Sequence, residues 1–445
     1  MRFALTVLCV SSLFACSRAE GTAPTVAFDR DFKALGSKPS LSLTIADPGT
    51  GLSQVSIHLK QKDQDIVLAE ETFAKGAAPK TKTYELGKLI SEKFKAQDGP
   101  ATLIVSATDH ALRNFLAGNR VETTRNFQFS VTPPQLEVLS GQHYINQGGS
   151  ECVVYRISPT VTSSGVQVGK RFFPGYPVAN APPEGDRKLY FALFALQYDE
   201  PVDTDMTVIA RDAVGNEVTA SFWHKVFPKK FRTRDIPLED AFIRKVVPEI
   251  TSHTPDIKNE GDPVQVFVKI NSELRRKNHE ALAEYAKQSG GVFLWSGPFV
   301  QLSNSKVEAF FADRRTYVYM GKPVDQQDHV GFDLSTVMHN PIEAGNDGKV
   351  VYADYFGIYG NAVILDHGAG LISIYGHMSS IDVKAGQTVK KKDILGKSGD
   401  TGLAGGDHLH FGLFLHGVPV NPTEWWDEKW IKDHVLDRFK AAGVS

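Results

Sequence analysis

The feature that most constrains this chain is a succession of short strand-like runs separated by turn residues. Runs such as LSLTIA, ATLIVSATD and YFALFALQY are bounded by clusters of Gly, Pro, Asp and Lys. Apolar, β-branched and aromatic side chains pack well on a pleated sheet, whereas Gly, Pro and Asp favour turns. The pattern fills residues 22–228 and returns from about residue 301 onward, which predicts a mainly β protein.

Two stretches of the length of one sandwich domain, residues 22–132 and 133–228, share a short motif. LIVSATDHALRN in the first and MTVIARDAVGN in the second each combine an apolar strand, Ala-x-Asp and a turn that ends in Asn. Both stretches resemble bacterial immunoglobulin-like modules, which implies two β-sandwich modules that act as spacers or binders. Residues 229–300 carry helix formers at helical spacing, with Pro237 near a start and Gly290 at an end. We predict a partly helical connector there.

The N-terminus has the pattern of an export signal. MRFALTVLCVSSLFAC contains one Arg and then an apolar run that is too short to span a bilayer, so residues 1–16 are predicted to be a signal peptide. LFAC resembles a bacterial lipobox, which implies acylation of Cys16; the alternative is ordinary cleavage, for example after Ala19. Cys152 is the one cysteine outside this signal, so an intrachain disulfide is not expected. We therefore expect an exported lipoprotein, held by its lipid anchor on the periplasmic face of an outer membrane.

Histidines gather in the C-terminal β region, in a segment that begins at His329. In GDHLHF, His408 and His410 lie on the same face of an expected strand, because successive side chains alternate. Zinc accepts imidazole nitrogen and carboxylate oxygen, and a catalytic zinc typically has three protein ligands and a water. His329, Asp333 and one histidine of the pair supply three ligands. The other member of the pair and His377 would then face the open coordination position.

The segments HVGFD, IYGHM and HLHF follow one another in the order and approximate spacing of the LytM/lysostaphin-type zinc metallopeptidases. The resemblance extends through connecting pieces such as PVNPTEWW and covers about a quarter of the chain. It implies one zinc ion per chain, bound by His329, Asp333 and His410, with His377 and His408 in catalysis. We assign His408 as the general base and His377 as the group that stabilises the oxyanion, and these two roles could be exchanged.

The resemblance also implies a fold for the C-terminal region. Residues 301–430 are expected to form an antiparallel β peptidase domain, followed by a tail at 431–445. His339, His367 and His416 lie in the same region, and we expect them to be structural or on the surface.

The family resemblance implies an endopeptidase that cuts peptide cross-links of bacterial peptidoglycan. An exported lipoprotein with spacer modules favours the D-alanyl–diaminopimelate bond over polyglycine bridges, with stem peptides as partners. A net charge of −2 without a long basic run makes nucleic acid an unexpected partner. Two alternatives remain: a LytM-type regulator that activates amidases, and a cell-wall adhesin. We also hypothesise that the connector 229–300 packs near the groove and limits access.

Overall fold

A computed structural model of the chain describes residues 21–112, 117–179, 181 and 185–444. Strands make up 44% of the residues and helices 17%, and most sheets are antiparallel, which confirms the mainly β fold class. Within the described ranges, no helix is long and apolar enough to cross a membrane. The predicted signal peptide and its Cys16 lie outside the described residues.

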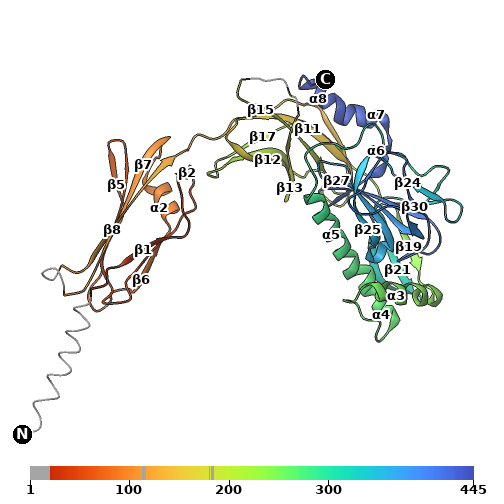
Figure 1. Ribbon diagram of the computed structural model, residues 1–445, viewed down its shortest axis with the longest axis horizontal. Helices are drawn as coiled ribbons and strands as arrows, with labels where there is room; N and C mark the ends of the chain where they lie inside the picture. Colours follow the sequence, from red (N-terminus) through yellow and green to blue (C-terminus); the bar gives the residue numbers. More distant parts are fainter. Residues whose placement is uncertain (1–20, 113–116, 180, 182–184, 445) are drawn as a thin grey trace, which may run out of the picture. The chain divides into compact units, whose positions relative to one another are not determined.

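The chain divides into two compact units, and the first consists mainly of the residues up to Pro134. In its described part, a three-stranded and a five-stranded sheet enclose one hydrophobic core (Figure 1). Val55, Ile57 and Leu59 are fully buried and alternate with more exposed residues, as the period of two along a strand requires. The elements are β1 (Thr25–Phe28), β2 (Ala34–Leu35), β3 (Leu43–Ala46), β4 (Leu52–Gln61), β5 (Gln64–Thr72), β6 (Thr81–Tyr84), α2 (Leu86–Lys93), β7 (Gly99–Asp109) and β8 (Arg120–Phe129).

The next stretch of chain forms two four-stranded sheets and one parallel strand pair. Its strands are β9 (Leu136–Val138), β10 (His143–Asn146), β11 (Ser150–Ile157), β12 (Val161–Val168), β13 (Arg171–Pro174), β14 (Tyr176–Pro177), β15 (Lys188–Ala195), β16 (Met206–Asp212), β17 (Glu217–Ser221) and β18 (His224–Phe227). Cys152 is buried in β11 and is a free thiol. The immunoglobulin-like character of both modules and the predicted domain boundaries stay predictions.

The segment predicted to be a partly helical connector contains β19 (Thr233–Pro237), α3 (Asp240–His253), α4 (Pro263–Lys269), the π-helix η1 (Ile270–Leu274) and α5 (Arg275–Lys287). Asp262 accepts a hydrogen bond from the backbone N–H of Val264, and Pro263 occupies the first turn, so α4 begins there. The helices bury their apolar side chains, including Phe267, in one core with Ile364 and other residues of the large C-terminal sheet. They therefore belong to the fold of the C-terminal region.

The C-terminal region is built on an eight-stranded sheet whose neighbouring strands are all antiparallel. Helix α5 lies against its strands β27 and β31 (Figure 1). The sheet consists of β20 (Lys306–Ala309), β23 (Phe332–Ser335), β25 (Gly348–Tyr355), β26 (Asn361–Asp366), β27 (Leu371–Met378), β29 (Thr388–Val389), β31 (Leu409–Leu415) and β32 (Val418–Val420). Two three-stranded sheets flank it, β19–β21–β22 and β24–β30–β28. Their further strands are β21 (Asp313–Tyr319), β22 (Lys322–His329), β24 (Pro341–Glu343), β28 (Ser380–Ile381) and β30 (Ile394–Lys397).

The last residues of the chain, which include the expected tail at 431–445, are mostly helical from Pro422 as far as Ala441. They form α6 (Pro422–Trp426), α7 (Glu428–Ile431), the π-helix η3 (Lys432–Leu436) and α8 (Asp437–Ala441). His434 and Arg438 pair with the fully buried carboxylate of Glu151 on β11, at 2.9 and 3.3 Å. The end of the chain is therefore docked on the β module that precedes the helices.

Candidate active site

Strand register brings the predicted metal ligands together. Asp333 on β23 lies directly opposite His410 on β31. His410 lies opposite Gly376 of β27 on its other side, which places His377 next to it. His329 is the last residue of β22, and the chain turns at once into β23. All five side chains predicted for the site therefore line one pocket.

Three side-chain atoms that can each bind a metal ion converge from these strands. His329 Nε2 lies 2.9 Å from Asp333 Oδ1 and 3.0 Å from His410 Nδ1. His410 Nδ1 in turn lies 3.0 Å from Asp333 Oδ1. This is the one group of His, Cys, Asp or Glu ligands suited to a metal ion within the ranges that the structure describes. Two imidazole nitrogens and a carboxylate oxygen fit zinc, whose usual ligands they are.

Backbone carbonyls determine the tautomers of three imidazoles. A carbonyl oxygen only accepts hydrogen bonds, so each ring carries its hydrogen on Nδ1 and keeps the lone pair on Nε2. The lone pair is the part of the ring that binds a metal or accepts a proton. The three pairs are His329 with Phe310 at 3.0 Å, His377 with Thr401 at 2.8 Å, and His408 with Gly406 at 2.7 Å.

Two backbone features make room for this arrangement. A Cβ atom at Gly331 would lie 2.7 Å from His410 Nε2, so a larger residue there would displace the ring. His377 has a φ of 63°, a left-handed conformation that non-glycine residues rarely adopt and that is often found at functional sites. Its ring lies 4.8 Å from that of His408, centroid to centroid. His377 thus combines a left-handed backbone conformation within β27 with a side chain that lines the pocket.

The charge of Asp333 dominates the electrostatics. Burial alone would raise the pKa of Asp333, but its close contacts with His329, His408 and His410 hold it well below its usual value. Burial lowers the pKa of His410 to about 4, and burial together with His408 and His410 holds the pKa of His377 well below its usual value. For His408, burial is outweighed by the Asp333 carboxylate 3.5 Å away, so its pKa is raised. The two histidines expected in catalysis therefore differ in proton affinity.

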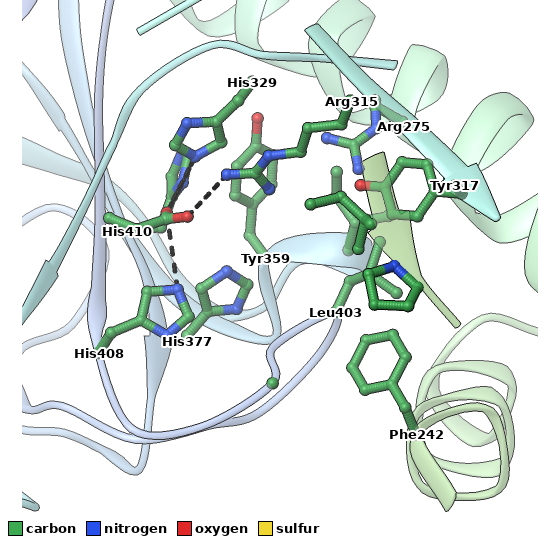
Figure 2. Close-up of a pocket in the computed structure, with 15 residues that line it drawn as sticks. Phe242, Arg275, Arg315, Tyr317, His329, Tyr359, His377, Leu403, His408 and His410 are labelled. Carbon is green, nitrogen blue, oxygen red and sulfur yellow. Dashed lines mark hydrogen bonds and ion pairs between the residues drawn. The ribbon is translucent and has the colours of Figure 1, made fainter. Parts of the chain in front are cut away.

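Arg315 is a site residue that the sequence analysis missed. Its Nη2 donates to Asp333 Oδ2 at 2.9 Å, so the carboxylate oxygen that faces the histidines is the other one (Figure 2). Arg315 and Tyr317 are two residues apart on β21 and both line the pocket. A charged residue in the strand that pairs with the one leading into HVGFD was the available signal. Its partner could not be identified without the fold.

The pocket over the three ligands has a volume of about 270 Å³. Ile236, Pro237 and Phe242, from β19 and α3, line it together with Leu403. Figure 2 shows Phe242 and Leu403 on the same side of the pocket. Arg275, the first residue of α5, also lines it. The segment predicted to be a connector therefore contributes directly to the site.

The remaining histidines of the region are engaged elsewhere. His367 is buried, with Nδ1 2.7 Å from the carbonyl oxygen of Asp347 and Nε2 2.7 Å from Ser373 Oγ. His339 is largely exposed. His416 stacks on Tyr176. None of these three histidines lines the pocket.

Comparison with known proteins identifies the domain that contains this site. The model of peptidase family M23 matches residues 327–422. The DD-carboxypeptidase/endopeptidase Mpg of Neisseria meningitidis is 35% identical over 95 residues, 21% of this chain and 22% of that protein. The peptidoglycan DD-endopeptidase ShyA of Vibrio cholerae is 39% identical over 93 residues, 21% of this chain and 22% of that protein. The match thus spans about a fifth of the length of these relatives.

A solved structure from Pseudomonas aeruginosa, assigned to peptidase M23, covers 60% of this chain and 88% of its own, at 22% identity and a TM-score of 0.36. The family match includes His329, Asp333, His377, His408 and His410. Residues 327–422 of this chain are a peptidase family M23 domain.

Proposed function

We propose that this chain is a zinc-dependent endopeptidase that hydrolyses peptide cross-links of bacterial peptidoglycan, with the D-alanyl–diaminopimelate amide as its bond. The observation that carries the proposal is the convergence of donor atoms from His329, Asp333 and His410 within 3.0 Å of one another. Relatives over this domain are named as peptidoglycan DD-endopeptidases. A regulator that had lost metal binding would have no reason to keep all three ligands and their supporting contacts.

In the proposed reaction, each residue has a distinct task. A zinc ion held by His329, Asp333 and His410 would lower the pKa of a water molecule and polarise the scissile carbonyl. His408, whose Nε2 carries the lone pair, takes the proton from the attacking water and passes it to the leaving amine. His377 is held by its Nδ1–H bond to Thr401, so its Nε2 stabilises the developing oxyanion once that nitrogen has taken up a proton.

The same proposal includes the location of the enzyme. Acylation of Cys16 would anchor the chain to the outer membrane, where its substrate lies on the periplasmic side. Several acyl chains contribute about 0.8 kcal/mol for each buried CH₂ group, which is enough for stable anchoring. Stem peptides of the wall are then the partners of the groove.

Digestion of purified sacculi tests the reaction. The protein is stripped with a chelator, reloaded with zinc and incubated with sacculi, and the released muropeptides are identified by mass spectrometry. We expect cross-linked dimers to become monomers with zinc and to stay intact with the chelator. Intact dimers in the presence of zinc would favour the amidase regulator or the adhesin. Glycan strands stripped of peptide would indicate an amidase.

A further inference from the structure

The pocket contains more positive charge than its metal site accounts for. Two guanidinium groups line it, those of Arg275 and Arg315, together with a single carboxylate, that of Asp333. Asp333 pairs with Arg315, and the same carboxylate is the proposed metal ligand. No Asp or Glu in the described ranges lies within ion-pair distance of Arg275. A bound metal ion would add to this excess, so the pocket suits an anionic ligand.

Arg275 is held in place by an irregularity in its helix. At the end of η1, the backbone N–H of Arg275 donates to Ile270 and Ser272 and passes over Asn271. The backbone carbonyl oxygen of Asn271 instead accepts a hydrogen bond from Arg275 Nε at 2.9 Å, and Arg275 Nη2 donates to Asn271 Oδ1 at 2.6 Å. Asn271 is itself held by Asp325 at 2.7 Å. Short π-helical turns of this kind are frequent at functional sites.

Both arginines keep donors for a further partner. In the part of the chain that the structure describes, Arg315 Nε is buried and has no hydrogen-bond partner. The bonds of Arg275 use Nε and Nη2, which leaves Nη1. Figure 2 shows the guanidinium of Arg275 beside Tyr317 and that of Arg315 nearer His410, with Phe242 farther away. An unsatisfied buried donor is costly, so an acceptor that entered here would be bound firmly.

We propose that Arg275 and Arg315 form an anion subsite beside the metal centre, which binds a carboxylate of the substrate peptide. A planar guanidinium matches the two oxygens of a carboxylate. The apolar lining of Ile236, Phe242 and Leu403 suits the aliphatic stem that carries such a group. This inference rests on the proposed function and makes it narrower. The subsite selects a cross-link whose diaminopimelate residue has a free carboxylate next to the scissile amide.

Binding to the metal-free protein tests the subsite without any turnover. The ligands are two cross-linked muropeptide dimers that differ only at the diaminopimelate of the cross-link, as free carboxylate or as carboxamide. Hydrogen bonds to a charged group contribute about 1.5–3 kcal/mol, so isothermal titration should show roughly 10- to 100-fold tighter binding of the free acid. In Arg275→Gln, this preference should fall to about threefold or less, with the affinity for the carboxamide unchanged. Arg275→Lys should keep part of it.

The matched control is Arg276→Gln. Arg276 is the next residue on the helix, is exposed, and pairs with Glu280. The Arg276→Gln variant should retain the full wild-type preference for the free-acid dimer. Equal binding of the two dimers by the wild type overturns the inference. A loss of the same factor for both dimers in Arg275→Gln also overturns it, because Arg275 would then act only through packing.

The outcome is separable from that of the proposed function. A wild type that cleaves sacculi but binds both dimers equally has the proposed activity without the subsite. A wild type that prefers the free acid but never cleaves has the subsite without the activity.

Discussion

Glu424 provides a quantitative test of the contact between the C-terminal helices and the β module that precedes the connector. It lies on α6 and is buried, where its carboxylate accepts from Asn146 Nδ2 at 2.9 Å and from the Ser150 backbone N–H at 2.8 Å. Trp425 Nε1 donates to Ser150 Oγ at 3.0 Å in the same cluster. Burial nevertheless raises the pKa of Glu424 from 4.5 to about 7, because the hydrogen bonds offset only part of the lost hydration.

The sign of the pH effect follows from this shift. An acid whose pKa is higher in the folded state binds more protons when folded, so its contribution to stability is greatest below about pH 4.5 and is lost as the pH rises to about 7. Each pKa unit corresponds to about 1.4 kcal/mol, and ionised Glu424 should therefore cost the fold about 3 kcal/mol above pH 7. Glu424→Gln keeps the shape of the neutral acid and cannot ionise. With the Asn146 amide turned over, the new side chain keeps its hydrogen bonds.

Urea unfolding of both proteins at pH 5 and pH 8, with chelator throughout, measures the effect. Relative to wild type, Glu424→Gln should gain about 2 to 3 kcal/mol between the two pH values. Glu428→Gln, an exposed carboxylate on the adjoining helix, should show no pH-dependent change. If Glu424→Gln gains nothing between pH 5 and pH 8, then the hydrogen bonds to Glu424 compensate the buried charge fully and our reasoning is wrong.

Three further predictions concern the site, the core and the anchor. His410→Ala should lose zinc and activity together, whereas His408→Ala should retain about one zinc per chain and lose roughly 10²- to 10⁴-fold in turnover. Metal analysis and the sacculus assay on both variants test this. If His408→Ala loses zinc and His410→Ala keeps it, the two histidines have been assigned the wrong way round. Phe267→Ala should destabilise the protein by about 3–5 kcal/mol, because Phe267 is fully buried in the core that the helices share with the C-terminal sheet. Urea unfolding measures this, and a loss below about 1 kcal/mol would show that the helices are dispensable to the peptidase fold. Cys16→Ala should abolish lipidation, as shown by the mass of the N-terminal peptide; a wild type without acyl chains would remove the anchor from the proposal.

The segment 229–300 shows why local pattern was insufficient. Helical spacing predicted helices there, and the structure contains them. That Phe267 would share a core with Ile364 was not visible, because the two residues are distant in sequence and the common core depends on how helices and sheet assemble. We hypothesised that this segment limits access to the groove. Since it builds a wall of the pocket and shares the core, we now expect its removal to unfold the domain.

The histidine pair shows the opposite case. The period of two along a strand predicted that His408 and His410 share a face, and both rings line the pocket. The residue types predicted His329, Asp333 and one histidine of the pair as ligands, and the family resemblance implied that this histidine is His410. The roles of Arg315 and Arg275 could not be predicted from the sequence, because each is an ordinary charged residue whose partners come from other strands and helices.

The sequence alone determined what depends on neighbouring residues: the mainly β class, the presence of strand-like runs, and the residue types that can hold a metal ion. Side-chain periodicity and turn preferences act over a few residues, so they are readable from the chain. The tertiary structure decided the pairing of Asp333 with His410, the docking of the C-terminal helices and the charge of the pocket. These features depend on strand register and on packing between distant segments, whose free energy belongs to the assembled fold and to no single stretch of sequence.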